Sequence, residues 1–283
     1  PQLIGRTVVF AGFCFLVWLA AVDSRRTVQS EDFFTDERAT VGIVQPNIPQ
    51  RLKYESYVYD TPESRRRQLQ DDILVKTFQL SRELQQGPPE ERCDLIVWPE
   101  TAVTYDFFSL IPAYRTVFND MATTRLQTTL LFGADNIEVL QDGELIPPEQ
   151  FNPDLYNRNP DAYRFVPHVS AWLAEPGTGL SRTIYNKMHL VPFAEGVPFV
   201  QHIRPLSALI SAVSGMQPYT PGAEHEVFEL KDPKSREPIL HFGPLICYES
   251  CYPRLSRAMV RQGAQALVMI TNDAWYERTA GPR

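Results

Sequence analysis

Three of the predicted strands end in side chains that can carry out nucleophilic chemistry. Glu100 follows the apolar run LIVWP, Lys187 follows TIYN, and Cys247 follows PLI. In α/β sheets, ligands bind beyond the carboxyl ends of the strands, so these three side chains can converge on one crevice. Their separation along the chain does not establish that convergence, which therefore enters as a hypothesis about the fold.

The three residue types form a consistent set for a cysteine nucleophile. A thiol with a pKa of about 8.5 is mostly protonated at neutral pH; a nearby carboxylate can accept its proton, while an ammonium group favours the thiolate. The same ammonium group can face the oxyanion of a tetrahedral intermediate, together with the backbone N–H of Tyr248. We expect Glu100 to be the base, Lys187 the oxyanion stabiliser and Cys247 the nucleophile.

Each of these residues also has a simpler interpretation. A glutamate or lysine at a strand end is commonly solvated, and a cysteine after an apolar run is commonly a packing residue. Cys251 is expected to be such a packing residue, because a disulfide with Cys247 would span a tight and stiff junction. Cys14 and Cys93 are expected to be small buried hydrophobes.

Composition excludes several classes of protein. The chain has 283 residues, 43% of them hydrophobic, and a formal net charge of −7, so it is globular and not suited to gripping nucleic acid. Its four cysteines show no CxxC pairing typical of zinc sites. The cysteine spacing therefore gives no sign of a zinc site.

The first residues predict a membrane segment. Residues 7–22, TVVFAGFCFLVWLAAV, carry no charge and lie between Arg6 and Asp23. A transmembrane helix is the favoured interpretation and a signal peptide is the alternative. We therefore divide the chain into a transmembrane helix with its flank (1–24), a linker (25–37) and one α/β domain (38–283).

Alternating strands and helices predict the architecture of that domain. A strand at 39–47 precedes a long helix, for which Thr61 is the expected N-cap, Pro62 the first helical residue and Gly87 the residue past the end. The buried-type strand CDLIVWPE, a helix over 114–126 and the strand TTLLFGAD indicate a parallel-type core. Residues 138–165 are expected to be a polar excursion. The last part repeats the pattern with a strand ending at Cys247, a helix over 252–262 and the strand ALVMITNDAW.

Five motifs occur in an order that resembles a known family. They are VGIVQPNIPQ, IVWPETA, YNKMHLVPFAEGVPF, ICYES and ITNDAWY, and together they resemble the apolipoprotein N-acyltransferase branch of the nitrilase superfamily. The resemblance implies a four-layer αββα sandwich in which Glu100, Lys187 and Cys247 form the catalytic triad. It further implies supporting or substrate-binding roles, which fall on Glu195, Tyr248, Glu249, Trp275 and Asn157.

The resemblance also implies a reaction and a location. Cys247 would take the sn-1 acyl chain of a phospholipid, such as phosphatidylethanolamine, as a thioester. The α-amine of an S-diacylglyceryl N-terminal cysteine on an apolipoprotein would then accept that chain. The implied enzyme needs no cofactor, is expected to be monomeric, and lies in the bacterial inner membrane with its catalytic domain on the extracytoplasmic side.

Family members carry a bundle of membrane helices before the catalytic domain and further elements after it. The chain is therefore expected to be a C-terminally truncated fragment of a polytopic membrane protein. Two apolar stretches, residues 107–114 and 199–213, are candidates for contact with lipid or for core helices.

Alternative functions remain open at this stage. A soluble nitrilase or amidase would use the same triad to hydrolyse a carbon–nitrogen bond, and an inactive nitrilase-like domain would only bind. A cysteine–histidine hydrolase is a less favoured alternative, because His189 is more simply explained as a structural residue of the run KMHLVPF.

Overall fold

The computed structural model describes residues 39–56, 61–88, 91–105, 108–146, 150, 152–192, 194–195 and 219–272. The expected membrane helix and linker, the apolar stretch 199–213 and Trp275 lie outside these ranges, as does Phe107. Within the described ranges, no helix has the length and apolar character needed to cross a membrane.

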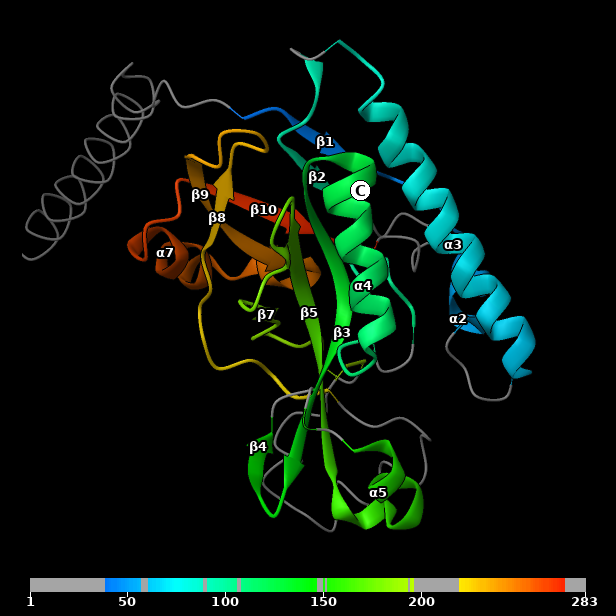
Figure 1. Cartoon of the computed structure of the whole chain (residues 1–283). Helices are drawn as coiled ribbons and strands as arrows, with labels where there is room; N and C mark the ends of the chain where they lie inside the picture. Colours follow the sequence, from blue (N-terminus) through cyan, green and yellow to red (C-terminus); the bar gives the residue numbers. More distant parts are fainter. Residues whose placement is uncertain are drawn as a thin grey trace, which may run out of the picture. The chain divides into compact units, whose positions relative to one another are not determined.

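The larger sheet combines parallel and antiparallel pairing (Figure 1). Its strands are β1 (Val41–Ile43), β2 (Leu95–Val97), β3 (Thr129–Gln141), β4 (Glu144–Ile146), β5 (Arg164–Glu175), β6 (Gly179–Leu180) and β7 (Tyr185–Asn186). β1, β2 and β3 run parallel, as the buried-type run around Ile96 predicted. β3 pairs antiparallel with β5, which in turn pairs antiparallel with β6 and β7. The sheet is therefore mixed: the predicted parallel-type core is confirmed for β1, β2 and β3, and the antiparallel pairing of the other strands was not predicted.

Two helices cover one face of this sheet (Figure 1). They are α3 (Glu63–Leu84) and α4 (Pro112–Asp120), and α4 continues into a π-helical turn, Met121–Leu126. Both helices were predicted, but Pro62 is the N-cap of α3 and not its first helical residue. Pro62 has extended geometry, with ψ 136°, and its carbonyl accepts hydrogen bonds from the N–H groups of Arg65 and Arg66. A short helix, α2 (Gln50–Glu55), precedes α3 and was not predicted.

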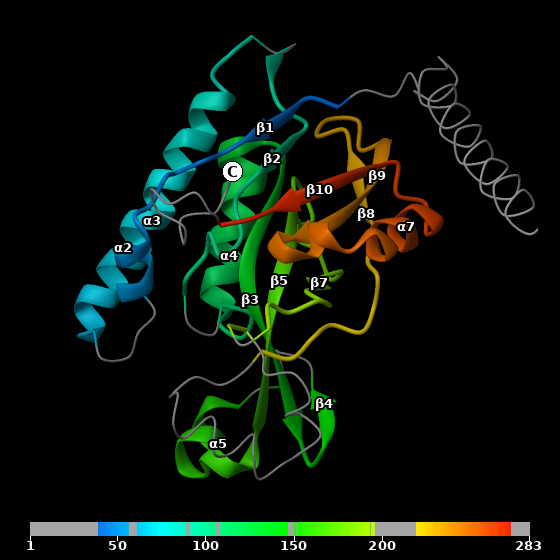
Figure 2. The same ribbon diagram turned by 180° about the vertical axis from the view of Figure 1, so that it is seen from behind.

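The second sheet contains β8 (Phe228–Lys231), β9 (Pro238–Ile246) and β10 (Ala266–Ile270). β9 pairs parallel with β10 and antiparallel with β8 (Figure 2). A helical turn, η7 (Cys247–Cys251), joins β9 to helix α7 (Pro253–Arg261). The predictions of β9, α7 and β10 are confirmed, whereas β8 was missed.

The two sheets pack against each other through a continuous apolar core. Leu95, Val97 and Leu131 of the first sheet contact a cluster that includes Phe242 and Ile246 of the second. Leu255 and Met259 of α7 belong to the same cluster, so α7 covers the far face of the second sheet. The described residues thus form helix, sheet, sheet and helix layers.

The polar segment at 138–165 is more ordered than the sequence predicted. β3 and β5 continue together past the rest of the sheet, with pairing from Leu130–Ala174 to Leu140–Arg164, and they reach the region of β4 and α5 (Pro153–Arg158) in Figure 1. Leu110, Val139 and Tyr163 form a small separate core there. A short helical turn, η5 (Pro160–Ala162), completes this extension.

Candidate active site

Lys187 lies at the centre of the candidate site, directly after β7. Its side chain is fully buried, and its Nζ atom is 3.2 Å from Oε1 of Glu100 and 2.7 Å from Oε1 of Glu195. Its backbone N–H donates to the carbonyl of Val169, and its own carbonyl accepts from the N–H of Gly222. One ammonium group is therefore held between two carboxylates on a fixed backbone.

Burial and charge act in opposite directions on these groups. Burial raises the pKa of Glu100 above its usual range, and the positive charge of Lys187 only partly opposes this. Burial lowers the pKa of Lys187, but the carboxylates of Glu100 and Glu195 outweigh it, so the net pKa is raised. Lys187 is thus held as a cation, while Glu100 has a higher proton affinity than an exposed carboxylate, as a general base requires.

Cys247 lies at the C-terminal end of β9 in an unusual backbone conformation. Its φ is +50°, in the left-handed region that non-glycine residues seldom adopt. Backbone strain of this kind is concentrated at functional sites. The resulting turn begins η7 and leaves the Cys247 side chain half-buried.

The Cys247 thiol lies within the electrostatic reach of both charged partners. Burial raises its pKa, and the negative charge of Glu100 raises it further. A hydrogen bond with Thr271, the charge of Lys187 and the N–H of Tyr248 act in the opposite direction. The fold therefore brings Glu100, Lys187 and Cys247 together, with a resting thiol that keeps its proton at neutral pH and needs a base to remove it.

Glu249 connects the Cys247 turn to the Lys187 segment. Its side chain is fully buried; Oε1 accepts from the Tyr185 hydroxyl at 2.8 Å and from the N–H groups of Met188 and His189 at 2.8 and 3.1 Å. Oε2 accepts from the N–H of Ile246 at 2.9 Å. A single carboxylate thus fixes Ile246, the residue before Cys247, relative to the residues that flank Lys187.

The other supporting residues have different surroundings. Oε2 of Glu195 accepts from the N–H of Val191 at 2.9 Å, which closes the turn that carries Glu195 toward Lys187. Tyr248 is half-buried and packs edge-on against Tyr252, with 5.3 Å between ring centroids. Asn157 is exposed on α5, and within the described ranges no hydrogen bond joins it to the triad. Its supporting role stays a prediction, as does that of Trp275.

Two features near the triad were missed by sequence reasoning. Lys53 of α2 is 5% exposed, and its Nζ donates to the backbone carbonyl of Glu100 at 3.0 Å. Asn186, directly before Lys187, accepts through Oδ1 from the Ser170 hydroxyl at 2.6 Å and from the Asn136 amide at 3.3 Å. A lysine in a short polar segment resembles a surface residue, so the sequence offered no signal for the burial of Lys53.

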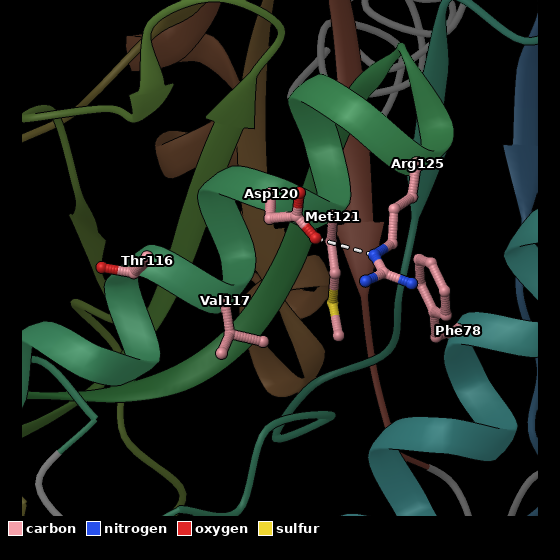
Figure 3. A pocket seen from close by; sticks show the side chains of 6 residues that line it. All are labelled: Phe78, Thr116, Val117, Asp120, Met121 and Arg125. Carbon is pink, nitrogen blue, oxygen red and sulfur yellow. Dashed lines mark hydrogen bonds and ion pairs between the residues drawn. The ribbon is translucent and has the colours of Figure 1, made fainter.

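A separate depression lies between α3 and α4, away from the triad (Figure 3). Its volume is about 540 Å³, and an ion pair of 2.7 Å between Asp120 and Arg125 lies beside it. The lining side chains are those of Phe78, Thr116, Val117, Asp120, Met121 and Arg125. In the described part of the chain, no group of three or more histidine, cysteine or acidic side chains is arranged to hold a metal ion.

Comparisons with known proteins agree with the motifs. Residues 67–283 match the carbon-nitrogen hydrolase family model. The chain is 30% identical over 254 residues to an apolipoprotein N-acyltransferase of Chlorobaculum tepidum, with 88% of this chain and 42% of that protein covered. It is 31% identical over 243 residues to an apolipoprotein N-acyltransferase of Geobacter metallireducens, with 86% and 37% covered.

Among solved structures, an amidase from Nesterenkonia sp. has 16% sequence identity and a TM-score of 0.43, with 84% of this chain and 66% of that chain covered. The chain spans less than half the length of the two curated relatives. The predicted resemblance to apolipoprotein N-acyltransferases is confirmed at the level of sequence similarity. The extent of the family match shows that this chain belongs to the carbon-nitrogen hydrolase family.

Proposed function

We propose that the chain carries the catalytic site of an apolipoprotein N-acyltransferase. In the first half-reaction, Glu100 takes the thiol proton while the sulfur of Cys247 attacks the sn-1 ester carbonyl of a phospholipid such as phosphatidylethanolamine. The ammonium group of Lys187 and the N–H of Tyr248 stabilise the resulting oxyanion. The intermediate collapses to a thioester, and the lysophospholipid oxygen leaves with the proton held by Glu100.

The second half-reaction transfers the acyl chain to an amine. The α-amine of an S-diacylglyceryl N-terminal cysteine attacks the thioester carbonyl, an amide bond forms, and the thiolate of Cys247 leaves. Glu100 takes the proton released by the amine and returns it to the sulfur. The proposed acceptor is an apolipoprotein, and both substrates are membrane-anchored. The resemblance to apolipoprotein N-acyltransferases supports a location at the extracytoplasmic face of a bacterial inner membrane.

One observation carries this proposal: the half-buried thiol of Cys247 lies in the electrostatic field of the buried pair of Glu100 and Lys187. That arrangement supports cysteine acyl chemistry. The choice of acceptor and donor rests on the names of the relatives, which are apolipoprotein N-acyltransferases.

Mass spectrometry tests the first half-reaction. After incubation of the protein with phosphatidylethanolamine vesicles, the peptide containing Cys247 should gain the mass of an acyl chain that hydroxylamine removes. Cys251→Ser is the matched control and should retain this modification, since Cys251 is free and exposed and is not the packing residue that the sequence predicted. Cys247→Ser should lose the hydroxylamine-sensitive modification, and its retention in that variant would contradict the proposal.

Hydrolysis of small amides is the second candidate function, and the match to the carbon-nitrogen hydrolase family favours it. The same thioester would then be released by water and not by an amine. Release of ammonia from short aliphatic amides, without acylation by phospholipid, would support this alternative over the first.

A further inference from the structure

A second buried lysine contacts the turn formed by Glu100 and Thr101 (the Glu100 turn). Lys53 belongs to α2, and its Nζ donates to the carbonyl oxygen of Glu100 at 3.0 Å. Its side chain is almost fully buried, although lysine is seldom buried without a partner. α2 is a short element without a side-chain N-cap, and Lys53 is the buried residue within it.

The turn that Lys53 contacts needs external support. Thr101, directly after Glu100, has a φ of +47°, a conformation that β-branched residues rarely adopt. Gly133 lies so close to the same turn that a Cβ atom built there would be 2.5 Å from the Thr101 nitrogen. The Glu100 turn is therefore packed closely against Gly133 and hydrogen-bonded to the Lys53 ammonium group.

The charge of Lys53 also acts on the Glu100 carboxyl group. Burial lowers the pKa of Lys53 to about 8, while the negative charges of Glu100 and Asp135 act to raise it. Lys53 therefore remains mostly protonated at neutral pH. Its positive charge in turn lowers the pKa of Glu100, in the same direction as the charge of Lys187 and against the charge of Glu195.

We propose that Lys53 is a positioning residue of the site, whose ammonium group fixes the Glu100 turn and keeps the Glu100 carboxyl group ionised. This inference rests on the proposed function, in which Glu100 is the base for Cys247. Lys53 acts on the reaction only through Glu100: Lys187 contacts the Glu100 carboxylate itself, and Lys53 contacts the carbonyl of the same residue. The site then contains two buried cations with different tasks.

The pH dependence of Cys247 alkylation by iodoacetamide tests this inference. Because Glu100 takes the thiol proton, the alkylation rate should fall as the pH drops through the pKa of Glu100. Replacement of Lys53 by methionine removes a cation, so the pKa of Glu100 should rise. The acid limb of the pH–rate profile, where the alkylation rate falls, should then move to higher pH by about one unit. Lys53→Arg keeps the charge and should return the limb toward its wild-type position.

Lys53→Gln keeps a hydrogen-bond donor but no charge, and it serves as the second variant if Lys53→Met does not fold. It should show the same displacement of the acid limb. Identical acid limbs in the wild type and in the uncharged variants would overturn the inference. Alkylation uses no acyl donor, so a protein that fails to acylate Cys247 would contradict the proposed function and still leave this test readable.

Discussion

Two regions of the site are built differently. The Lys187 cluster consists of Lys187, Glu100 and Glu195, and the Cys247 turn consists of Ile246 and the helical turn Cys247–Cys251. Around Lys187, three charged side chains are in direct contact, and the ammonium group is completely buried. At Cys247, the side chain is half-buried and the turn is held mainly by backbone N–H groups that donate to Glu249. The charged groups are thus fixed by direct contacts inside the protein, while the Cys247 side chain, the proposed nucleophile, remains partly exposed.

The largest effect is expected when the cation is removed from the buried cluster. In Lys187→Met, the carboxylates of Glu100 and Glu195 lose their shared partner inside the protein. Breaking such a buried pair typically costs about 3–5 kcal/mol of folding stability, and loss of an oxyanion donor lowers the rate by about 10² to 10³. Denaturant unfolding and the rate of Cys247 acylation measure the two losses.

Lys231→Met is the matched control for that substitution. Lys231 pairs with Glu229 at 2.9 Å but is 30% exposed, so its removal should cost about 1 kcal/mol or less. Equal losses of stability in the two variants would show that the Lys187 cluster is not a special electrostatic unit.

A smaller effect is expected at the carboxylate that supports the nucleophile turn. Glu249→Gln places an amide N–H₂ where a carboxylate oxygen accepted backbone N–H groups. Hydrogen bonds to charged groups contribute about 1.5–3 kcal/mol each, so stability should fall by about 2 kcal/mol and Cys247 acylation should slow. Calorimetric unfolding together with the acylation rate tests this expectation.

Glu229→Gln is the surface counterpart, since Glu229 is 36% exposed in its ion pair with Lys231. It should leave both stability and acylation nearly unchanged. Should Glu249→Gln behave like this control, the Cys247 turn would be held by the backbone alone.

The close contact between Gly133 and the Glu100 turn allows the position of Glu100 to be changed without changing its charge. A Cβ atom at Gly133 would lie 2.7 Å from the Cα atom of Glu100, so Gly133→Ala must displace the Glu100 turn without altering any charge. Overpacking costs about 1–3 kcal/mol, and a displacement of the base by about 1 Å can slow the reaction by about 10². Acylation rates and unfolding midpoints of the variant measure these effects.

Gly87→Ala is the control for that variant, because its added Cβ would meet only the flexible side chain of Glu91, at 3.3 Å. Wild-type acylation by Gly133→Ala would mean that the position of Glu100 is not critical.

The sequence predicted the convergence of Glu100, Lys187 and Cys247 better than it predicted the sheet that carries them. Glu100, Lys187 and Cys247 each follow a short apolar run, and the carboxyl ends of strands are where such residues meet. Glu195 and Glu249, which the motifs singled out, contact Lys187 and the backbone next to it, and their supporting roles stay predictions. Their hydrogen bonds to Val191 and Ile246 depend on turns that no local pattern encodes.

The strand β5 was missed because its sequence does not resemble a strand. Pro167 and His168 interrupt its apolar residues. Even so, Pro167 lies opposite Ile137 in the sheet, and the buried ring of His168 has a hydrogen-bond partner, because its Nδ1 atom contacts the carbonyl of Thr220. Strand formation there is decided by pairing with β3, not by local propensity. Lys53 was missed for a related reason, because it is buried in a tertiary contact with the Glu100 turn and not through a local sequence pattern.

The central claim is that Glu100 is the base that activates Cys247. The most direct test compares the rate of Cys247 acylation by phosphatidylethanolamine in the wild type and in Glu100→Gln across acidic and neutral pH. Because burial raises the pKa of Glu100, the wild-type rate should fall with decreasing pH at a midpoint above the value of about 4.3 for an exposed glutamate. Glu100→Gln should be slow at every pH, without that acid limb; a variant as fast as the wild type would contradict the account.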